Sequence, residues 1–290
     1  MSAEAYNKLS VSDKKFTISD CHLHSDFSSD SSAAPRDIIE MAISLGLRSI
    51  CFTDHNDFDY PLENGKTVFN IDLPEYIRTL KPLADEYRSK PDARMEIQIG
   101  VEQGLMKSVA DKINAFDSGK ELDFIIGSSH LVNGADPYYP SFWEGADVRR
   151  GILSYYESIL ENLEACSNFD VYGHIDYIVR YIPEERADEY RESDYYEILD
   201  AILRSIIAHE KGIEINTAGF KYKLNRPNPS EFIIKRYREL GGEIITVGSD
   251  AHEPGHMAYC FYKVPDILKS AGFKYYTRFI KRAPEFISLD

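Results

Sequence analysis

The sequence is poor in cysteine, with only four among its 290 residues. Cys21, Cys51, Cys166 and Cys260 are widely separated and form no CxxC pair. This spacing argues against a disulfide framework and against a zinc site built on thiolates. Because disulfides are rare in reducing compartments, we expect free thiols and a cytoplasmic location.

Long apolar runs and an excess of positive charge are also missing. No stretch is long enough to span a bilayer as a helix, and residues 1–15 are polar, so we expect a polar N-terminal extension rather than a signal peptide. The formal net charge is −15, from 33 basic and 48 acidic residues. Nucleic acids and anionic membranes are bound by surfaces rich in Lys and Arg, so we expect neither as a partner.

Several common catalytic signatures are absent as well. No strand is followed by G-x-G-x-x-G, and neither GxxxxGK[ST] nor G-x-S-x-G occurs, which argues against dinucleotide binding, a P-loop and a serine-hydrolase nucleophile. No linker or low-complexity segment divides the chain, so we expect a single domain over residues 1–290.

What the sequence does contain is an alternation of short apolar runs with amphipathic, helix-length segments. Seven strands are predicted: Phe16–Cys21, Ser49–Thr53, Met95–Val101, Phe124–Ser128, Asp170–Gly173, Gly212–Ile215 and Glu243–Gly248. Helices are predicted between them, and one more after Pro265. This alternation is typical of an α/β protein with a parallel sheet, and seven such units favour a barrel.

Metal-binding residue types recur at the ends of these strands. His22 and His24 alternate with Leu23, so in an extended strand both side chains point to the same face. Six of the eight histidines, together with two acids, stand just after a predicted strand: His22, His24, His55, His130, His174, His252, Glu102 and Asp250. In a barrel these ends converge at the C-terminal face, where active sites lie. Imidazole and carboxylate ligands suit Zn, Fe or Mn, and this many ligands indicates two or three ions.

In chain order these residues form a motif series that resembles the polymerase-and-histidinol-phosphatase (PHP) superfamily. The series consists of Asp20-Cys21-His22-Leu23-His24, Thr53-Asp54-His55, Glu102, Ser129-His130, Gly173-His174 and Ser249-Asp250-Ala251-His252. Segments 173–181, 214–219 and 248–252 are similar to its monofunctional histidinol phosphatases. The resemblance extends from Thr17 to Tyr262 and implies a distorted (β/α)7 barrel with a trinuclear metal site at the C-terminal face of the strands.

The resemblance also implies a ligand set for each ion. One ion would take His22, His24, Glu102 and Asp250, a second would share Glu102 and add His130 and His174, and a third would take Asp30, His55 and His252. Asp26 is an alternative to Asp30 in the same loop. Asp20 and Asp54 are interpreted as partners that orient ligating histidines.

Cationic side chains in two loops of the same face are candidates for binding phosphate. Arg180 matches an arginine of the family, whereas the second arginine position aligns with Lys221, and Arg226 is the alternative to it. His256 is a candidate proton donor or a bystander, and His209 is expected to have no role in the site. Tyr138, Tyr139, Phe142 and Trp143 are candidates for a wall against the substrate, and the loop 56–70 for a lid.

These features predict a metal-dependent hydrolysis of L-histidinol phosphate to L-histidinol and phosphate by a metal-activated hydroxide, in histidine biosynthesis. Two alternatives stay open. One is a PHP-type phosphoesterase for another small phosphomonoester or a nucleotide, and the other is a metal-binding module without catalysis.

Overall fold

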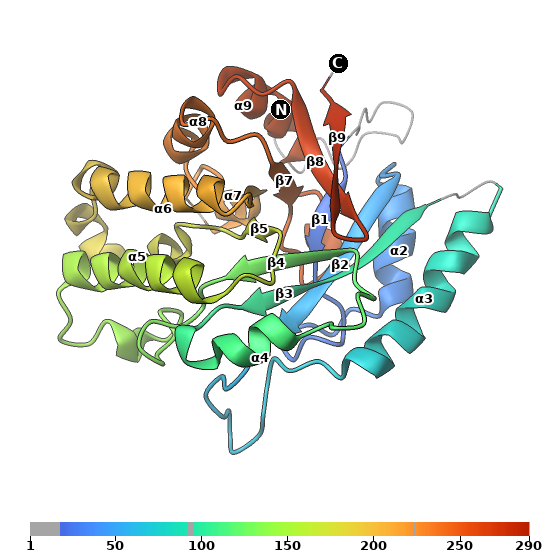
Figure 1. Ribbon diagram of the computed structural model, residues 1–290, viewed down its shortest axis with the longest axis horizontal. Coiled ribbons are helices and arrows are strands. Elements are labelled where there is room, and N and C mark those ends of the chain that lie inside the picture. The colour runs from blue at the N-terminus through green and yellow to red at the C-terminus, as the bar shows by residue number, and fades with distance from the viewer. Residues whose placement is uncertain (1–17, 92–94, 223, 290) are drawn as a thin grey trace.

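Seven parallel strands, hydrogen-bonded in sequence order, form a barrel-like sheet in the computed structural model, which describes residues 18–91, 95–222 and 224–289 (Figure 1). The strands are β1 (Asp20–Leu23), β2 (Ser49–Asn56), β3 (Glu96–Gly104), β4 (Phe124–Ser128), β5 (Val171–Tyr172), β6 (Gly212–Asn216) and β7 (Ile245–Gly248). The expected distorted (β/α)7 barrel is confirmed.

The barrel is closed between its first and last strands by the chain that follows β7. The backbone N–H of Asp250 donates to His22 O at 2.9 Å, and that of His24 donates to Ala251 O at 2.9 Å. The first and last ligand motifs of the sequence are therefore held side by side by main-chain hydrogen bonds.

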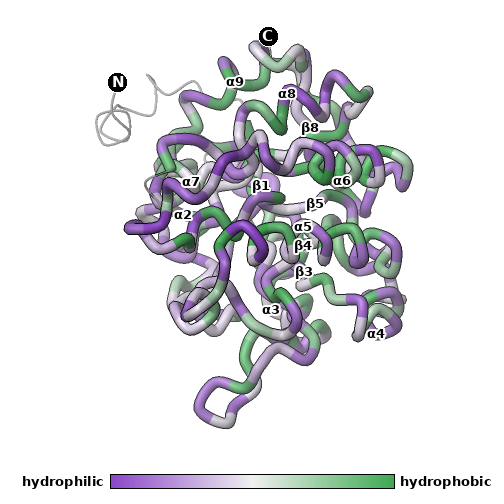
Figure 2. The backbone as a smooth tube through the Cα atoms, turned by 90° about the vertical axis from the view of Figure 1, so that its left-hand side faces the viewer, coloured by the Kyte–Doolittle hydropathy of each residue, from purple (hydrophilic) through white to green (hydrophobic). Residues whose placement is uncertain are grey.

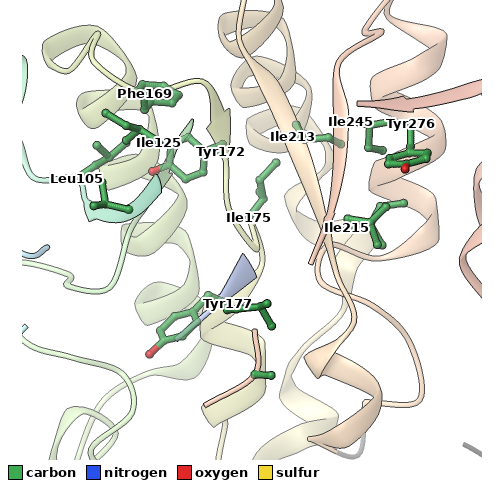
Figure 3. Packing of buried hydrophobic residues seen from close by; sticks show 14 of the residues in the cluster. Leu105, Ile125, Phe169, Tyr172, Ile175, Tyr177, Ile213, Ile215, Ile245 and Tyr276 are labelled. Carbon is green, nitrogen blue, oxygen red and sulfur yellow. The ribbon is translucent and has the colours of Figure 1, made fainter. Parts of the chain in front are cut away.

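Helices surround the sheet and bury their apolar faces against it (Figure 1). They are α2 (Pro35–Ser44), α3 (Leu73–Ser89), α4 (Ala110–Ala115), α5 (Val148–Ala165), α6 (Tyr196–Ala208), α7 (Ala218–Lys221), α8 (Glu231–Glu239) and α9 (Val264–Ser270). Figure 3 shows part of the core, where Ile213 and Ile215 of β6 lie near Ile245 of β7. None of the described helices is long and apolar enough to cross a membrane.

Four strands extend further than the apolar pattern predicted: β1 to Leu23, β2 to Asn56, β3 to Gly104 and β6 to Asn216. β2 and β3 stay paired through Asp54↔Val101 and His55↔Glu102, so both candidate ligands lie within strands rather than after them. The polar side chains of His55 and Glu102 face one another in a buried site. Polar residues therefore continue these strands, and the change from apolar to polar residues does not mark the strand end. β1 begins at Asp20, and Phe16, Thr17 and the expected extension 1–15 lie outside the described residues.

The C-terminal tail forms a β-hairpin that the sequence did not predict. β8 (Tyr275–Ile280) and β9 (Ala283–Ser288) pair antiparallel and cover the N-terminal ends of the barrel strands. Thr277 Oγ1 accepts from Ile245 N at 3.2 Å, and Arg282 N donates to Asp123 O at 2.8 Å. Phe279 stacks on Phe124 at 5.0 Å between ring centroids. The hairpin therefore closes the end of the barrel opposite the candidate ligands.

Removing the Phe279 ring is expected to destabilise the protein without affecting the site. Phe279 is 5% exposed, and truncating a buried Phe to Ala costs about 3–5 kcal/mol through lost burial and the cavity left behind. Phe279→Ala should lower the free energy of unfolding by that amount in urea titrations. Phe286→Ala in the same hairpin is the control, because this ring is 48% exposed and its loss should change stability by less than about 0.5 kcal/mol.

One of the long connections on the ligand side is the segment 57–70 between β2 and α3. It projects from the rest of the chain and is mainly hydrophilic (Figures 1 and 2). Tyr60 OH donates to Asp136 Oδ2 at 2.7 Å, and Tyr139 OH donates to Glu63 Oε1 at 2.5 Å. These two bonds join the segment to the loop after β4, so the two loops together form one wall over the barrel end.

Candidate metal centre

The nine predicted ligands form one connected cluster at the C-terminal ends of the strands. They are His22, His24, Asp30, His55, Glu102, His130, His174, Asp250 and His252, and each lies within 3.7 Å of another member of the set. Barrel closure brings together residues that are up to 230 positions apart in the sequence.

Glu102 lies at the centre of the cluster and is 1% exposed. Its Oε1 faces His174 Nε2 at 2.8 Å and His130 Nε2 at 3.2 Å. Its Oε2 faces His22 Nε2 at 3.1 Å, His24 Nε2 at 3.4 Å and His55 Nδ1 at 3.3 Å. Each oxygen therefore faces a separate group of histidines. A carboxylate in this arrangement can bridge two cations.

Asp30, His55 and His252 form the outer edge of the cluster. Asp30 Oδ2 lies 3.0 Å from His252 Nε2 and 3.6 Å from His55 Nε2. The alternative, Asp26, is exposed and has no ion pair with a histidine among the described residues. The geometry therefore favours Asp30 over Asp26.

The hydrogen bonds behind three histidines fix which ring nitrogen faces the centre. His22 Nδ1 donates to Glu214 Oε1 at 2.6 Å, His130 Nδ1 donates to Asp57 Oδ2 at 2.6 Å, and His24 Nδ1 lies 3.1 Å from Ser28 Oγ. With the proton on Nδ1, each ring presents the lone pair of Nε2 to the cluster.

The residues fit a metal site on this geometry. The Nε2 atoms of His22 and His24 face each other at 3.0 Å, so two lone pairs meet unless a cation or proton lies between them. The buried His174 Nδ1 has no hydrogen-bond partner in the described part of the chain. Three groups bring their donor atoms within 4.8 Å of one another: His24, His55 and His252; His22, His24 and Glu102; and His55, Glu102 and His130. Nitrogen and carboxylate donors without thiolates suit Zn, Fe or Mn.

The two buried carboxylates of the cluster are held in the ionised form. Burial raises the pKa of Glu102, but His22, His130 and His55 outweigh it and keep the pKa well below its ordinary value. Burial likewise raises the pKa of Asp250, while His22, His24 and Arg180 bring it well below. Both groups therefore carry the negative charge that a cation would neutralise.

Two of the orienting acids, Glu214 and Asp57, were not predicted from the sequence. Asp57 lies in no motif. Glu214 begins the segment 214–219, but no role was assigned to it, and it is 192 positions from the histidine it orients. Asp54, which was predicted, acts through Ser28, whose hydroxyl donates to Asp54 Oδ1 at 2.9 Å while its oxygen faces His24.

The interpretation of Asp20 was wrong. Its carboxylate accepts from the backbone and hydroxyl of Ser249 and from Ala258 N, and it bonds to no histidine ring among the described residues. Asp20 therefore holds the loop that carries Asp250 and His252, rather than a ligating ring.

Weakening the bond behind His22 is expected to weaken metal binding. Glu214→Gln keeps the size of the side chain but removes its charge, so the imidazole becomes a poorer ligand. Changes of this kind lower metal affinity about 10- to 100-fold, which a titration against a competing chelator measures. Glu243→Gln, at a side chain that is 69% exposed, is the control and should leave the affinity unchanged.

A cavity of about 790 Å³ opens above the cluster. Arg180, Lys221 and His256 line it, and Lys221 Nζ lies 3.5 Å from His256 Nδ1. Burial lowers the pKa of Lys221, and Asp250 opposes this shift. Arg226 is not among the lining residues, because its guanidinium is bound to Asp176 at 2.6 Å. The geometry therefore favours Lys221 over Arg226 as the second phosphate-binding cation.

Only part of the predicted aromatic wall borders this cavity. Tyr138 and Tyr139 line it, together with Tyr60, which was not predicted, whereas Phe142 borders a neighbouring cavity and Trp143 is 4% exposed in the core. His209 is exposed at the end of α6, away from the cluster.

Comparison with known proteins finds relatives along most of the chain. The histidinol-phosphatase of Lactococcus lactis subsp. lactis (strain IL1403) is 33% identical over 256 residues, which is 88% of this chain and 91% of that protein. The probable histidinol-phosphatase of Thermotoga maritima is 31% identical, over 88% of this chain and 93% of that protein.

The fold is also shared with solved structures. The crystal structure of histidinol phosphate phosphatase from Lactococcus lactis subsp. lactis Il1403, complexed with zinc, L-histidinol and phosphate, has a TM-score of 0.83 and 31% identity, covering 92% of this chain and 98% of that one. The profile of the PHP domain matches residues 20–218, more than half of the chain. The chain therefore belongs to the PHP domain family.

Proposed function

We propose that this protein is a metal-dependent phosphatase that hydrolyses L-histidinol phosphate to L-histidinol and phosphate. The observation that carries the proposal is the placement of Glu102, whose two oxygens face separate histidine groups beneath a cavity that Arg180 and Lys221 line. The histidinol-phosphatases among its relatives support the choice of substrate.

The cluster has ligands for two or three divalent ions, which we propose to be Zn, Fe or Mn. His22, His24, Glu102 and Asp250 would hold the first. Glu102 would be shared with a second ion that His130 and His174 complete, and the outer group Asp30, His55 and His252 would hold the third. The contacts of Glu102 support its role as the bridging ligand.

The chain's own residues supply the binding of the phosphate group. When bound, the ions would act as Lewis acids on phosphate oxygens and lower the pKa of a water molecule toward neutrality. Arg180 and Lys221 would bind the non-bridging oxygens, where negative charge spreads during phosphoryl transfer. The loop wall held by Tyr60 and Asp136 would limit the access of bulk water.

The lining of the cavity also contains acidic and aromatic side chains, which suit the other end of this substrate. Glu63 and Asp136 line the cavity, together with Tyr138, Tyr139 and Tyr177. Histidinol phosphate carries an ammonium group and an imidazole, which carboxylates and tyrosine rings can bind. A cavity lined by both cations and carboxylates thus offers partners for the phosphate and for the ammonium group of this substrate.

The proposal is tested by assaying metal-loaded protein against histidinol phosphate, serine phosphate, ribose 5-phosphate and adenosine monophosphate. We expect kcat/KM for histidinol phosphate to exceed the others by at least about tenfold, equivalent to about 1.4 kcal/mol of transition-state discrimination. If another ester had a higher kcat/KM, that ester would be assigned as the substrate instead of histidinol phosphate. Cleavage of oligonucleotides would indicate a nuclease. The combined variant His22→Ala and His24→Ala, purified in parallel, should be inactive and controls for contaminating phosphatases.

A further inference from the structure

A chain of buried hydrogen bonds connects Arg226, which lies outside the cavity, to Arg180, which lines it. Arg226 Nη1 donates to Asp176 Oδ2 at 2.6 Å, and Asn228 Nδ2 donates to Asp176 Oδ1 at 2.6 Å. Asn228 Oδ1 in turn accepts from Arg180 Nε at 2.7 Å. Asp176 and Asn228 are both fully buried, so their side chains depend on these protein partners rather than on bulk water.

The charge of Asp176 determines which way the amide group of Asn228 is turned. An asparagine amide can turn either its oxygen or its NH2 group toward a neighbour, but a carboxylate only accepts hydrogen bonds. Asp176 therefore binds the NH2 group of Asn228 and leaves the amide oxygen facing Arg180. In the reversed orientation, the NH2 group of Asn228 would meet the N–H of Arg180, donor against donor.

The remaining bonds of Arg180 determine what its guanidinium can still bind. Nη1 donates to Asp250 Oδ2 at 3.1 Å, and Nη2 donates to Asn216 Oδ1 at 2.9 Å. A guanidinium has five N–H groups, and three are used by Asn228, Asp250 and Asn216. Within the described part of the chain, one N–H on each terminal nitrogen is left, which matches two oxygens of a phosphate group bound side by side.

Arg226 itself is poorly placed to share this task. Its guanidinium is held by the Asp176 carboxylate and by the backbone oxygen of Pro227 at 2.9 Å. Without Arg226, Asp176 would be a buried charge whose one remaining side-chain partner among the described residues is the neutral amide of Asn228, which is costly. Arg226 therefore compensates the charge of Asp176.

We propose that Asp176 and Asn228 are positioning residues that orient Arg180 for the phosphate group, and that Arg226 acts by holding Asp176 rather than by contacting phosphate. The inference rests on the proposed function, since it assigns phosphate to Arg180. It gives a role to three residues that lie behind the cavity wall.

The inference is tested with Asp176→Asn in the metal-loaded protein, using inorganic phosphate as the probe in isothermal titration calorimetry. The new amide offers one oxygen, so it cannot accept from both Arg226 and Asn228. Phosphate should bind about tenfold more weakly, and KM for histidinol phosphate should rise by a similar factor. Metal content should stay at the wild-type level.

Combining Asp176→Asn with Asn228→Asp separates orientation from general structural damage. The exchange places a carboxylate next to Arg180 and an amide next to Arg226, so every donor again has an acceptor. Phosphate affinity should return to within about threefold of wild type. A combined variant as weak as Asp176→Asn alone would refute the positioning role.

Asp170→Asn is the matched control at the opposite end of the barrel. Asp170 and Arg282 form an ion pair of the same 2.6 Å length, and Arg282 is as exposed as Arg226, at 23%. This variant should lose stability but keep its affinity for phosphate. Unchanged phosphate binding in Asp176→Asn would overturn the inference, as would equal losses in both variants. The titration requires no ester hydrolysis, so failure of the wild type to cleave histidinol phosphate would refute the proposed function separately.

Discussion

Glu102→Gln is expected to lower kcat for histidinol phosphate by about a thousandfold, an effect as large as the loss of a preorganised electrostatic contact at a reacting centre. Glutamine has nearly the same shape as glutamate but one oxygen and one NH2 group. One of the two histidine groups around Glu102 would then meet a donor instead of an acceptor, and the cluster would lose a negative charge. Steady-state kinetics should be combined with elemental analysis, which should show fewer bound ions per chain.

The matched control is Glu96→Gln, because Glu96 lies at the other end of the same strand, β3. Its carboxylate pairs with Arg278 of the hairpin at 2.5 Å, remote from the cluster. This substitution should change kcat by less than about twofold, since a partly exposed pair contributes little. A Glu102→Gln enzyme that kept a tenth of wild-type kcat would show that Glu102 is not the bridging ligand.

The position of the cluster could be predicted because its ligands follow a regular rule. In a parallel barrel the C-terminal strand ends meet at one face, so His22, Glu102 and Asp250 are predicted to converge although they lie far apart in the sequence. The seven-stranded barrel followed from the same alternation. Strand limits were less accurate, because β2 and β3 continue through polar residues that face one another.

Two of the orienting residues, Glu214 and Asp57, could not be predicted, because their partners are set by packing and not by spacing. Glu214 lies in an apolar strand and reaches across the barrel to His22, so no local pattern relates the two. Arg226 was an alternative phosphate ligand because it lies in the loop after the sixth strand, close to the position of the family's second arginine. In the structure its guanidinium is instead paired with the buried Asp176. The hairpin was missed because its exposed residues interrupt the apolar pattern, although Phe279 and Tyr276 are buried.

Removal of metal is expected to abolish turnover and to lower thermal stability together. The cluster contains buried carboxylates and imidazoles whose lone pairs face one another, so the ions should stabilise the folded chain as well as the reaction. A ligand at 1,000 times its dissociation constant contributes about 4 kcal/mol per site, and about 1 kcal/mol shifts Tm by roughly 2–4 °C in a protein of this size. Dialysis against a chelator should lower Tm by about 10 °C or more.

The combined variant His22→Ala and His24→Ala shows whether the fall in Tm comes from loss of metal at this site or from a general effect of the chelator. It lacks two ligands and one of the closest contacts in the cluster, the 3.0 Å approach of the two Nε2 atoms. Its Tm should respond less to the chelator than that of the wild type. Adding Zn, Mn or Fe back to the wild type should restore both Tm and turnover, and the ion that restores them at the lowest free concentration is the one that the site prefers. Full activity after complete removal of metal would contradict both the centre and the mechanism built on it.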